Sequence, residues 1–118
     1  MALGAELNAA AGERVALAAL GSIASGLSAA GTTQATATAL TRATNVVTTC
    51  AQLAGVRLPV CGAGDRIHVA NNTAVNLLVY PPTGGSLSGR TANLGAVLAP
   101  NSAADFVSTD GTSYTVLL

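Results

Sequence analysis

Few side chains in this sequence can carry chemistry, and they are widely spaced. His68 is the only histidine, and Cys50 and Cys61 are too far apart for a CxxC redox motif. One imidazole and two thiols do not complete a four-ligand zinc site, so we expect no metal. The cysteines are either two buried thiols, the commoner case, or a disulfide that closes a short loop, and the sequence leaves both open.

The remaining candidates for catalysis have structural explanations. Asp65 follows glycines at the start of a strand, Asp105 lies beside a turn, and Asp110 begins a tight turn. Their spacing does not indicate the paired carboxylates of a glycosidase or a calcium loop. No serine lies in a nucleophile elbow that His68 could serve. Residues 84–89 are glycine-rich but lack the lysine and helix of a phosphate-binding loop. We therefore expect no catalytic residues, no cofactor and no enzymatic activity.

Composition favours assembly. Half of the 118 residues are hydrophobic, but only 3% are aromatic, so a single domain would have a thin core. Five basic and five acidic residues give a net charge of zero. A surface so poor in charge is unsuited to binding nucleic acid, which needs basic patches. It suits burial against neighbouring proteins, and we expect an oligomer.

The first 31 residues differ from the rest. They are rich in Ala, Leu and Gly, and some apolar residues recur at helical spacing, which predicts an arm or short helix over residues 1–31. Glycines and serines interrupt the apolar run, so neither a signal peptide nor a membrane span is expected. The residues expected to mediate assembly are Leu20, Ile23 and Leu27.

Residues 32–118 predict a β-domain. Alternating patterns indicate strands at 36–41, 45–50, 65–70, 74–80, 95–98, 103–108 and 112–118. Asn71 and Asn72 predict a hairpin between the third and fourth of these, although residues 71–73 also match the N-glycosylation pattern. Asp110 and Gly111 predict another hairpin. We expect a mainly β protein, a small antiparallel β-sandwich or barrel. The expected core residues are Ile67, Val69, Val75, Leu77, Val79 and Phe106.

The order of turns and strands in the second half resembles a small β-module of tailed-bacteriophage virion proteins. The resemblance rests on GDRIHVANNT at residues 64–73, VYPPTGGSLSG at 79–89, LAPNSAADFVS at 98–108, and the closing aromatic Tyr114. Such modules occur in capsid decoration proteins and in head or tail fibres. They are structural and commonly trimeric. These motifs are turn and core positions without reactive groups, and residues 1–61 lie outside the resemblance.

Two functions follow as expectations. The first is a capsid decoration (cement) protein or head fibre that coats the outer surface of the virion as a homotrimer. Its partners would be copies of itself and the major capsid protein or another virion protein, with no nucleic acid and no membrane. The alternative is a receptor-binding module of a fibre or spike that contacts a host-surface glycan or protein. That module would use the loop at residues 83–93, with Arg90 as its polar contact.

Overall fold

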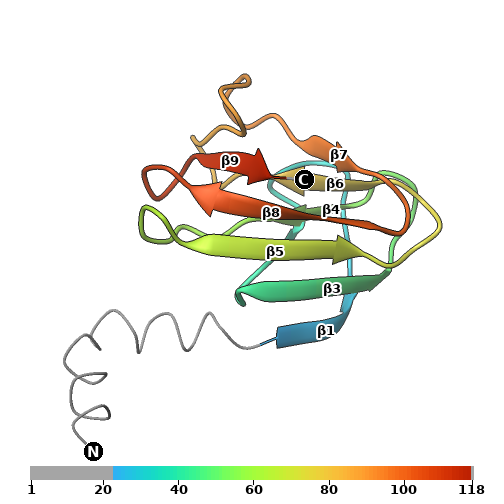
Figure 1. Ribbon diagram of the computed structural model, residues 1–118. Helices are drawn as coiled ribbons and strands as arrows, with labels where there is room; N and C mark the ends of the chain where they lie inside the picture. Colours follow the sequence, from blue (N-terminus) through green and yellow to red (C-terminus); the bar gives the residue numbers. More distant parts are fainter. Residues whose placement is uncertain (1–22, 118) are drawn as a thin grey trace, which may run out of the picture.

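The computed structural model describes residues 23–117, which form two packed β-sheets (Figure 1). The five-stranded sheet has the order β1-β3-β5-β8-β9 and the four-stranded sheet the order β2-β4-β6-β7. The first sheet contains β1 (Ile23–Ser28), β3 (Thr44–Thr49), β5 (Arg66–Asn71), β8 (Ser102–Ser108) and β9 (Tyr114–Leu117). The second contains β2 (Thr38–Ala39), β4 (Gly55–Arg57), β6 (Leu77–Tyr80) and β7 (Ala96–Leu98).

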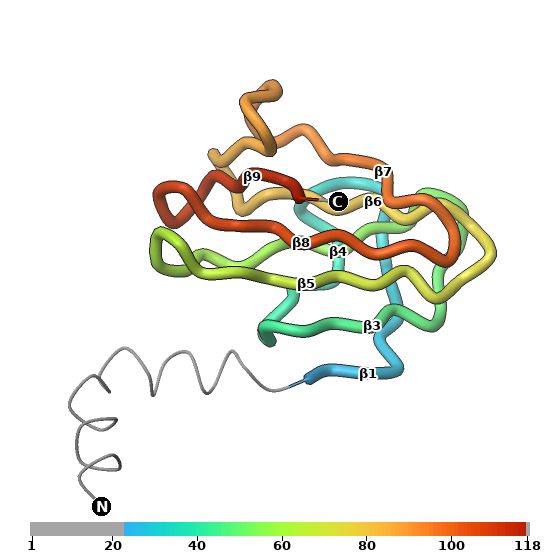
Figure 2. Tube along the Cα trace, in the orientation of Figure 1, coloured from blue at the N-terminus to red at the C-terminus, as the bar shows by residue number. Residues whose placement is uncertain are grey.

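The mainly β prediction is confirmed, but the sheets are mixed. From β1 to β6 the chain alternates between the two sheets, and it can be followed from one to the other in Figure 2. Consecutive strands in each sheet are therefore parallel: β1, β3 and β5 in one, and β2, β4 and β6 in the other. Antiparallel pairing begins with β7, and the predicted hairpin at Asp110 is present between β8 and β9.

The hairpin predicted at Asn71 and Asn72 is wrong. β5 pairs with β3 and β8, whereas β6 lies in the other sheet. Asn71 is fully buried, and its Nδ2 donates to the carbonyls of Val75, Leu98 and Ala99 at 2.8, 3.0 and 3.0 Å. These bonds hold the crossing from β5 to β6 against the turn between β7 and β8. The amide is thereby fully engaged, so Asn71 is not available as a glycosylation acceptor.

The helical interpretation is wrong for Ile23–Ser28, which forms strand β1 beside β3. Helical spacing was the local signal, but pairing with a neighbouring strand outweighs intrinsic propensity in residues this small. Gly26 has φ = 69°, and the register shifts between Ala24 and Leu27, so the strand is irregular. Residues 23–28, which the sequence placed in the arm, are thus part of the five-stranded sheet.

The core lies between the two sheets. Ile67, Val69, Leu77, Val79 and Phe106 are buried there, together with Leu58, Leu87 and Tyr114. Val75, which alternation placed on the same face as Leu77, is only half-buried. It precedes β6 in a turn where its carbonyl accepts hydrogen bonds from the Asn71 and Thr73 side chains.

The chain itself covers the outer face of the four-stranded sheet. Tyr80 points outward from β6, next to inward-facing Val79, yet it is only 7% exposed. Its hydroxyl donates to the carbonyl of Thr32 at 3.2 Å, and a Cβ on Gly55 would lie 2.6 Å from its ring. Gln34 donates to the carbonyl of Pro81 at 2.8 Å. Residues 30–37 therefore form a cover over this sheet.

The two outer edges of the five-stranded sheet differ. Along β9, Tyr114 exchanges backbone hydrogen bonds with Ser86 and Ser88, and the Ser88 hydroxyl accepts from the Val116 amide at 3.0 Å. The chain thus occupies this edge itself. β1 forms the opposite edge.

Candidate functional site

The strongest candidate is the outer face of the five-stranded sheet, which we call the open face. Side chains alternate along these strands, so that Ile67, Val69 and Phe106 point into the core and their neighbours point outward. No other element described between residues 23 and 117 covers this side. The outward residues of the central strands and β9 are Thr44, Val46, Arg66, His68, Ala70, Ala103, Asp105, Val107 and Thr115.

Three of these residues form a charged cluster. His68 and Asp105 are directly opposite in the β5–β8 register. The Nδ1 of His68 lies 2.7 Å from Oδ1 of Asp105, and an Arg66 guanidinium nitrogen lies 3.2 Å from Oδ2. Because an ionised carboxylate only accepts hydrogen bonds, Nδ1 carries the proton and donates. The bond from His68, followed by the one from Arg66, lowers the pKa of Asp105 below its ordinary value.

Alternation with the expected core residues Ile67 and Val69 puts Arg66 and His68 on the outward face. Sequence reasoning placed Asp105 beside a turn and did not bring it to them. Asp105 is 37 positions from His68. The only sequence signal was that both residues lie outward in strands, which becomes informative once β5 and β8 are known to pair.

The register sorts the outward side chains of the open face into rows. One row across the sheet contains Thr44, His68 and Asp105, with the Arg66 guanidinium reaching into it. The next row contains Val46, Ala70 and Ala103, whose side chains are short. A polar row therefore runs beside an apolar one. At the ends of the polar row lie Ile23 and Leu117, which are 62% and 43% exposed.

The open face is unusual for the parallel strands that it contains. Parallel strands generally have both faces covered, whereas antiparallel sheets often have one face in water. Here β1, β3 and β5 are parallel, and their outer face is bare among the described residues. That combination makes the open face the candidate site.

The three residues expected to mediate assembly lie in different situations. Ile23 is exposed at the start of β1, beside the open face. Leu27 packs against the protein's own core. Leu20 lies outside the described residues.

The cysteines are free thiols with separate surroundings. Cys50 contacts the carbonyls of Ala51, Ala54 and Asn76, and burial raises the pKa of its thiol. Cys61 lies 3.0 Å from the hydroxyl of Tyr114, which also bonds the carbonyl of Pro59. Burial raises the pKa of Tyr114, so its hydroxyl stays protonated and structural.

The loop proposed for receptor contact is exposed but braced. Asn93 accepts a hydrogen bond from the amide of Gly84 at 2.6 Å and donates its own amide to the carbonyl of Gly85 at 2.8 Å. Arg90 is exposed near the tip. All three aromatic residues of the chain, Tyr80, Phe106 and Tyr114, are buried. The loop therefore offers no aromatic platform of the kind that sugars stack on.

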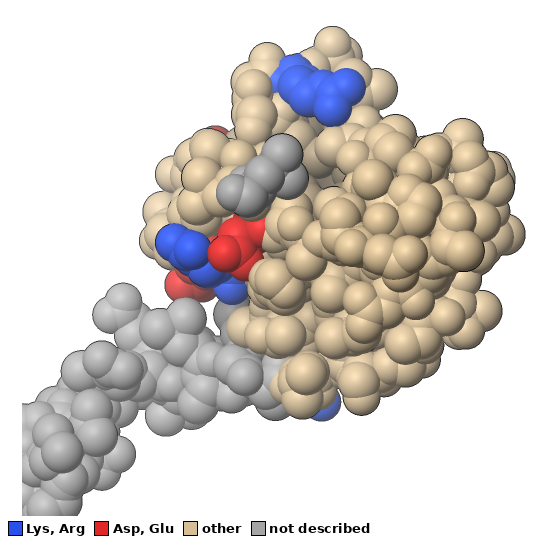
Figure 3. Space-filling model, turned by 45° about the vertical axis from the view of Figure 1, so that its right-hand side comes forward, with Lys and Arg blue, Asp and Glu red and all other residues tan. Residues whose placement is uncertain are grey.

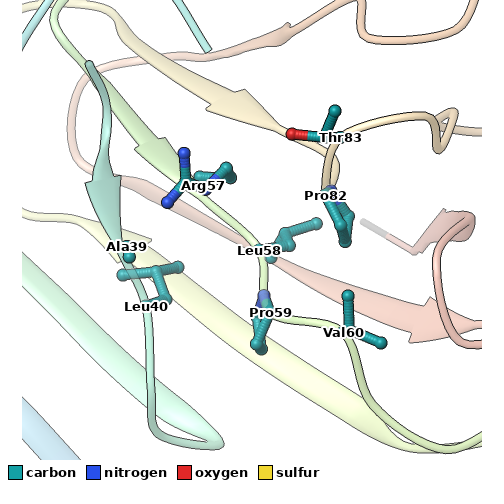
Figure 4. Close-up of a pocket in the computed structure, with 8 residues that line it drawn as sticks. All are labelled: Ala39, Leu40, Arg57, Leu58, Pro59, Val60, Pro82 and Thr83. Carbon is teal, nitrogen blue, oxygen red and sulfur yellow. The ribbon is translucent and has the colours of Figure 1, made fainter. Parts of the chain in front are cut away.

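A hollow of about 410 Å³ lies beside β2 and β4 (Figure 4). Its walls are mainly apolar, with Leu40 and Leu58 at the base and Val60, 69% exposed, at one side. Arg57 is the only charged residue among those that line it, and its guanidinium already donates to the Gln34 carbonyl at 3.1 Å. Nothing in its lining favours one occupant over another.

Charge is confined to small areas of the surface. In the view of Figure 3 the coloured side chains gather mainly in two places, at the top and at the left, and the broad surface on the right shows none. Within the described part of the chain, no group of three His, Cys, Asp or Glu side chains could hold a metal ion. No helix in residues 23–117 has the length and hydrophobicity to cross a membrane.

Comparison with known proteins gives no match, so a functional assignment rests on this geometry and on the sequence. The chain matches no protein-family model, no curated protein and no solved structure.

Proposed function

We propose that this protein is a structural assembly protein of a tailed-bacteriophage virion, a capsid decoration protein or head fibre. The carrying observation is the open face, a bare surface on partly parallel strands with short side chains. The virion assignment is supported by the resemblance of residues 64–118 to phage β-modules.

The proposed mechanism is burial without chemistry. Covering apolar surface contributes about 25 cal/mol per Å², and a protein that binds only the assembled shell stabilises that shell by mass action. Ile23, Val60 and Val97 are 62%, 69% and 58% exposed and supply apolar contact area. The outer surface of the capsid is the expected location, and the major capsid protein the expected partner.

The test is retention on shells. Purified protein is mixed with undecorated shells of the phage that encodes it and, separately, with host cells, and each mixture is sedimented. We expect saturable, stoichiometric retention on shells. Binding to host cells alone would overturn the proposal in favour of a receptor-binding module.

A truncation locates the anchor. Removing residues 1–22 leaves β1 and the cover over the four-stranded sheet intact, whereas a longer deletion would remove part of the fold. We expect the truncated protein to keep its β-sheet circular dichroism spectrum and to lose shell binding. Undiminished coating of shells would assign the anchor to the described domain instead.

A further inference from the structure

We propose that residues 1–22 form one further coil of the β-fold and supply a strand that pairs with the free edge of β1. The inference goes beyond the proposed function, because it concerns the free protein and names the segment that closes its open end. It does not depend on whether the protein binds a shell.

The first six strands form three coils of similar length. Strands β1, β3 and β5 begin at residues 23, 44 and 66, so the chain returns to the same sheet every 21 or 22 residues. Because successive strands of each sheet pair in parallel, each coil stacks on the one before it. The 22 residues that precede β1 therefore suffice for one more coil that ends where β1 begins.

The two ends of this stack of coils differ. At the C-terminal end the antiparallel strands β7, β8 and β9 follow, and the backbone of Ser86 and Ser88 occupies the edge of β9. At the other end β1 is the edge strand, and no described element pairs with its outer side (Figure 1). Such an edge presents unpaired N–H and C=O groups, whose natural partner is another strand. β1 contains neither the charged residues nor the prolines that commonly protect an edge.

A short sequence repeat points to the residues before β1 as the source of that strand. Residues 10–18 read AAGERVALA and residues 29–37 read AAGTTQATA, which are identical at five of nine positions. The second copy of the repeat directly follows β1 and leads into the cover over the four-stranded sheet. Residues 4–9, which directly precede the first copy, therefore correspond to β1 and would lie alongside it.

The shared positions are those at which the first coil tolerates little change. Ala30 forms a β-bridge with Gly55. Gly31 has φ = 72°, and a Cβ there would overlap the side chain of Thr36. Ala37 is only 7% exposed. The matching residues of the preceding segment are Ala11, Gly12 and Ala18, so this segment has the residue types that the same connection requires about one coil earlier.

Amide hydrogen exchange of the full chain, measured at several protein concentrations, tests the coil. Ala18→Arg places a charge at the position that matches buried Ala37 and should release the added strand. We expect the amides on the outer side of β1 to exchange about tenfold or more faster in this variant than in the unaltered chain. Ala16→Arg is the matched control, because Ala16 corresponds to exposed Ala35, and it should leave exchange in β1 unchanged. Unaltered protection of β5 and β8 confirms that each variant is folded.

Three results would overturn the inference. The first is fast exchange of the outer β1 amides in the unaltered chain, and the second is an equal effect of the two substitutions. The third is protection of β1 that increases with protein concentration, which would assign this edge to a second copy. Shell binding by a chain whose β1 edge is unprotected would leave the proposed function standing, whereas a protected chain that ignores shells would overturn only the proposed function.

Discussion

The outer faces of the two sheets differ, because one is covered by the chain and the other is exposed among the described residues. The four-stranded sheet is covered by residues 30–37, with Tyr80 lying flat between Gly55 and Gly95. The five-stranded sheet bears short side chains and a charged cluster, and none of the other described elements lies over it. Within residues 23–117, therefore, the chain covers the outer face of the smaller sheet and leaves that of the larger sheet exposed. The following substitutions test that difference within a single chain.

The largest expected loss of stability comes from a substitution on the covered face. Tyr80→Ala removes a ring that is 7% exposed and should lower the free energy of unfolding by about 3–5 kcal/mol. Val107→Ala, on the open face, should cost less than about 1 kcal/mol in the monomer. Urea denaturation at a single low protein concentration compares them. Equal losses would mean that the two faces do not differ.

Gly55→Ala tests whether Tyr80 needs the space above that glycine. The new Cβ would lie 2.6 Å from the Tyr80 ring, so the ring must shift, at a cost of about 1–3 kcal/mol. In a Tyr80→Ala background the same substitution should cost almost nothing. The double-mutant cycle measures this coupling by denaturation, and additive losses would contradict the packing described.

Gln34→Ala removes one side-chain attachment of the cover. The hydrogen bond to the carbonyl of Pro81 is lost, and the free energy of unfolding should fall by about 1 kcal/mol. Amide hydrogen exchange should accelerate in residues 30–37 more than in β5 or β8. Uniform acceleration throughout the domain would show that the cover does not open separately.

The smallest effect is expected from Asp105→Asn on the open face. The pKa of Asp105 is lowered in the folded protein, so the ionised side chain stabilises the fold above its unfolded pKa, ordinarily 3.8. This contribution is lost as the pH falls below 3.8 through the folded value. For a partly exposed ion pair it should not exceed about 1 kcal/mol. Denaturation of both proteins at pH 6 and pH 2.5 should show a smaller difference at pH 2.5; a difference that does not shrink would contradict it.

Local patterns predicted where most strands lie but not how they pair. Alternation identified β5, β8 and β9, and Asp110 with Gly111 identified the turn between the last two. The same reasoning failed at Asn71, because that side chain bonds carbonyls 27 and 28 positions away. A turn signal shows that the chain reverses, but it does not say in which sheet the next strand lies.

For the same reason, only part of the candidate site could be predicted from the sequence. His68 was correctly placed outward, but its partner Asp105 comes from a strand brought alongside by long-range pairing. Strand β1 was missed because its alanine, two serines and glycine carry no strand preference, and β3 supplies the partner that makes it a strand. Both the His68–Asp105 pair and strand β1 depend on contacts between segments that are distant in the sequence.

The occupied edge of β9 limits where further strands can be added to this sheet. A sheet with two open edges is a template that further chains can extend without end, as in amyloid. Here the backbone of Ser86 and Ser88, with the Ser88 hydroxyl, already bonds Tyr114 and Val116, so strands can be added only at β1. At the described edges of this sheet, growth by strand addition therefore ends after one partner, which caps the sheet at β1.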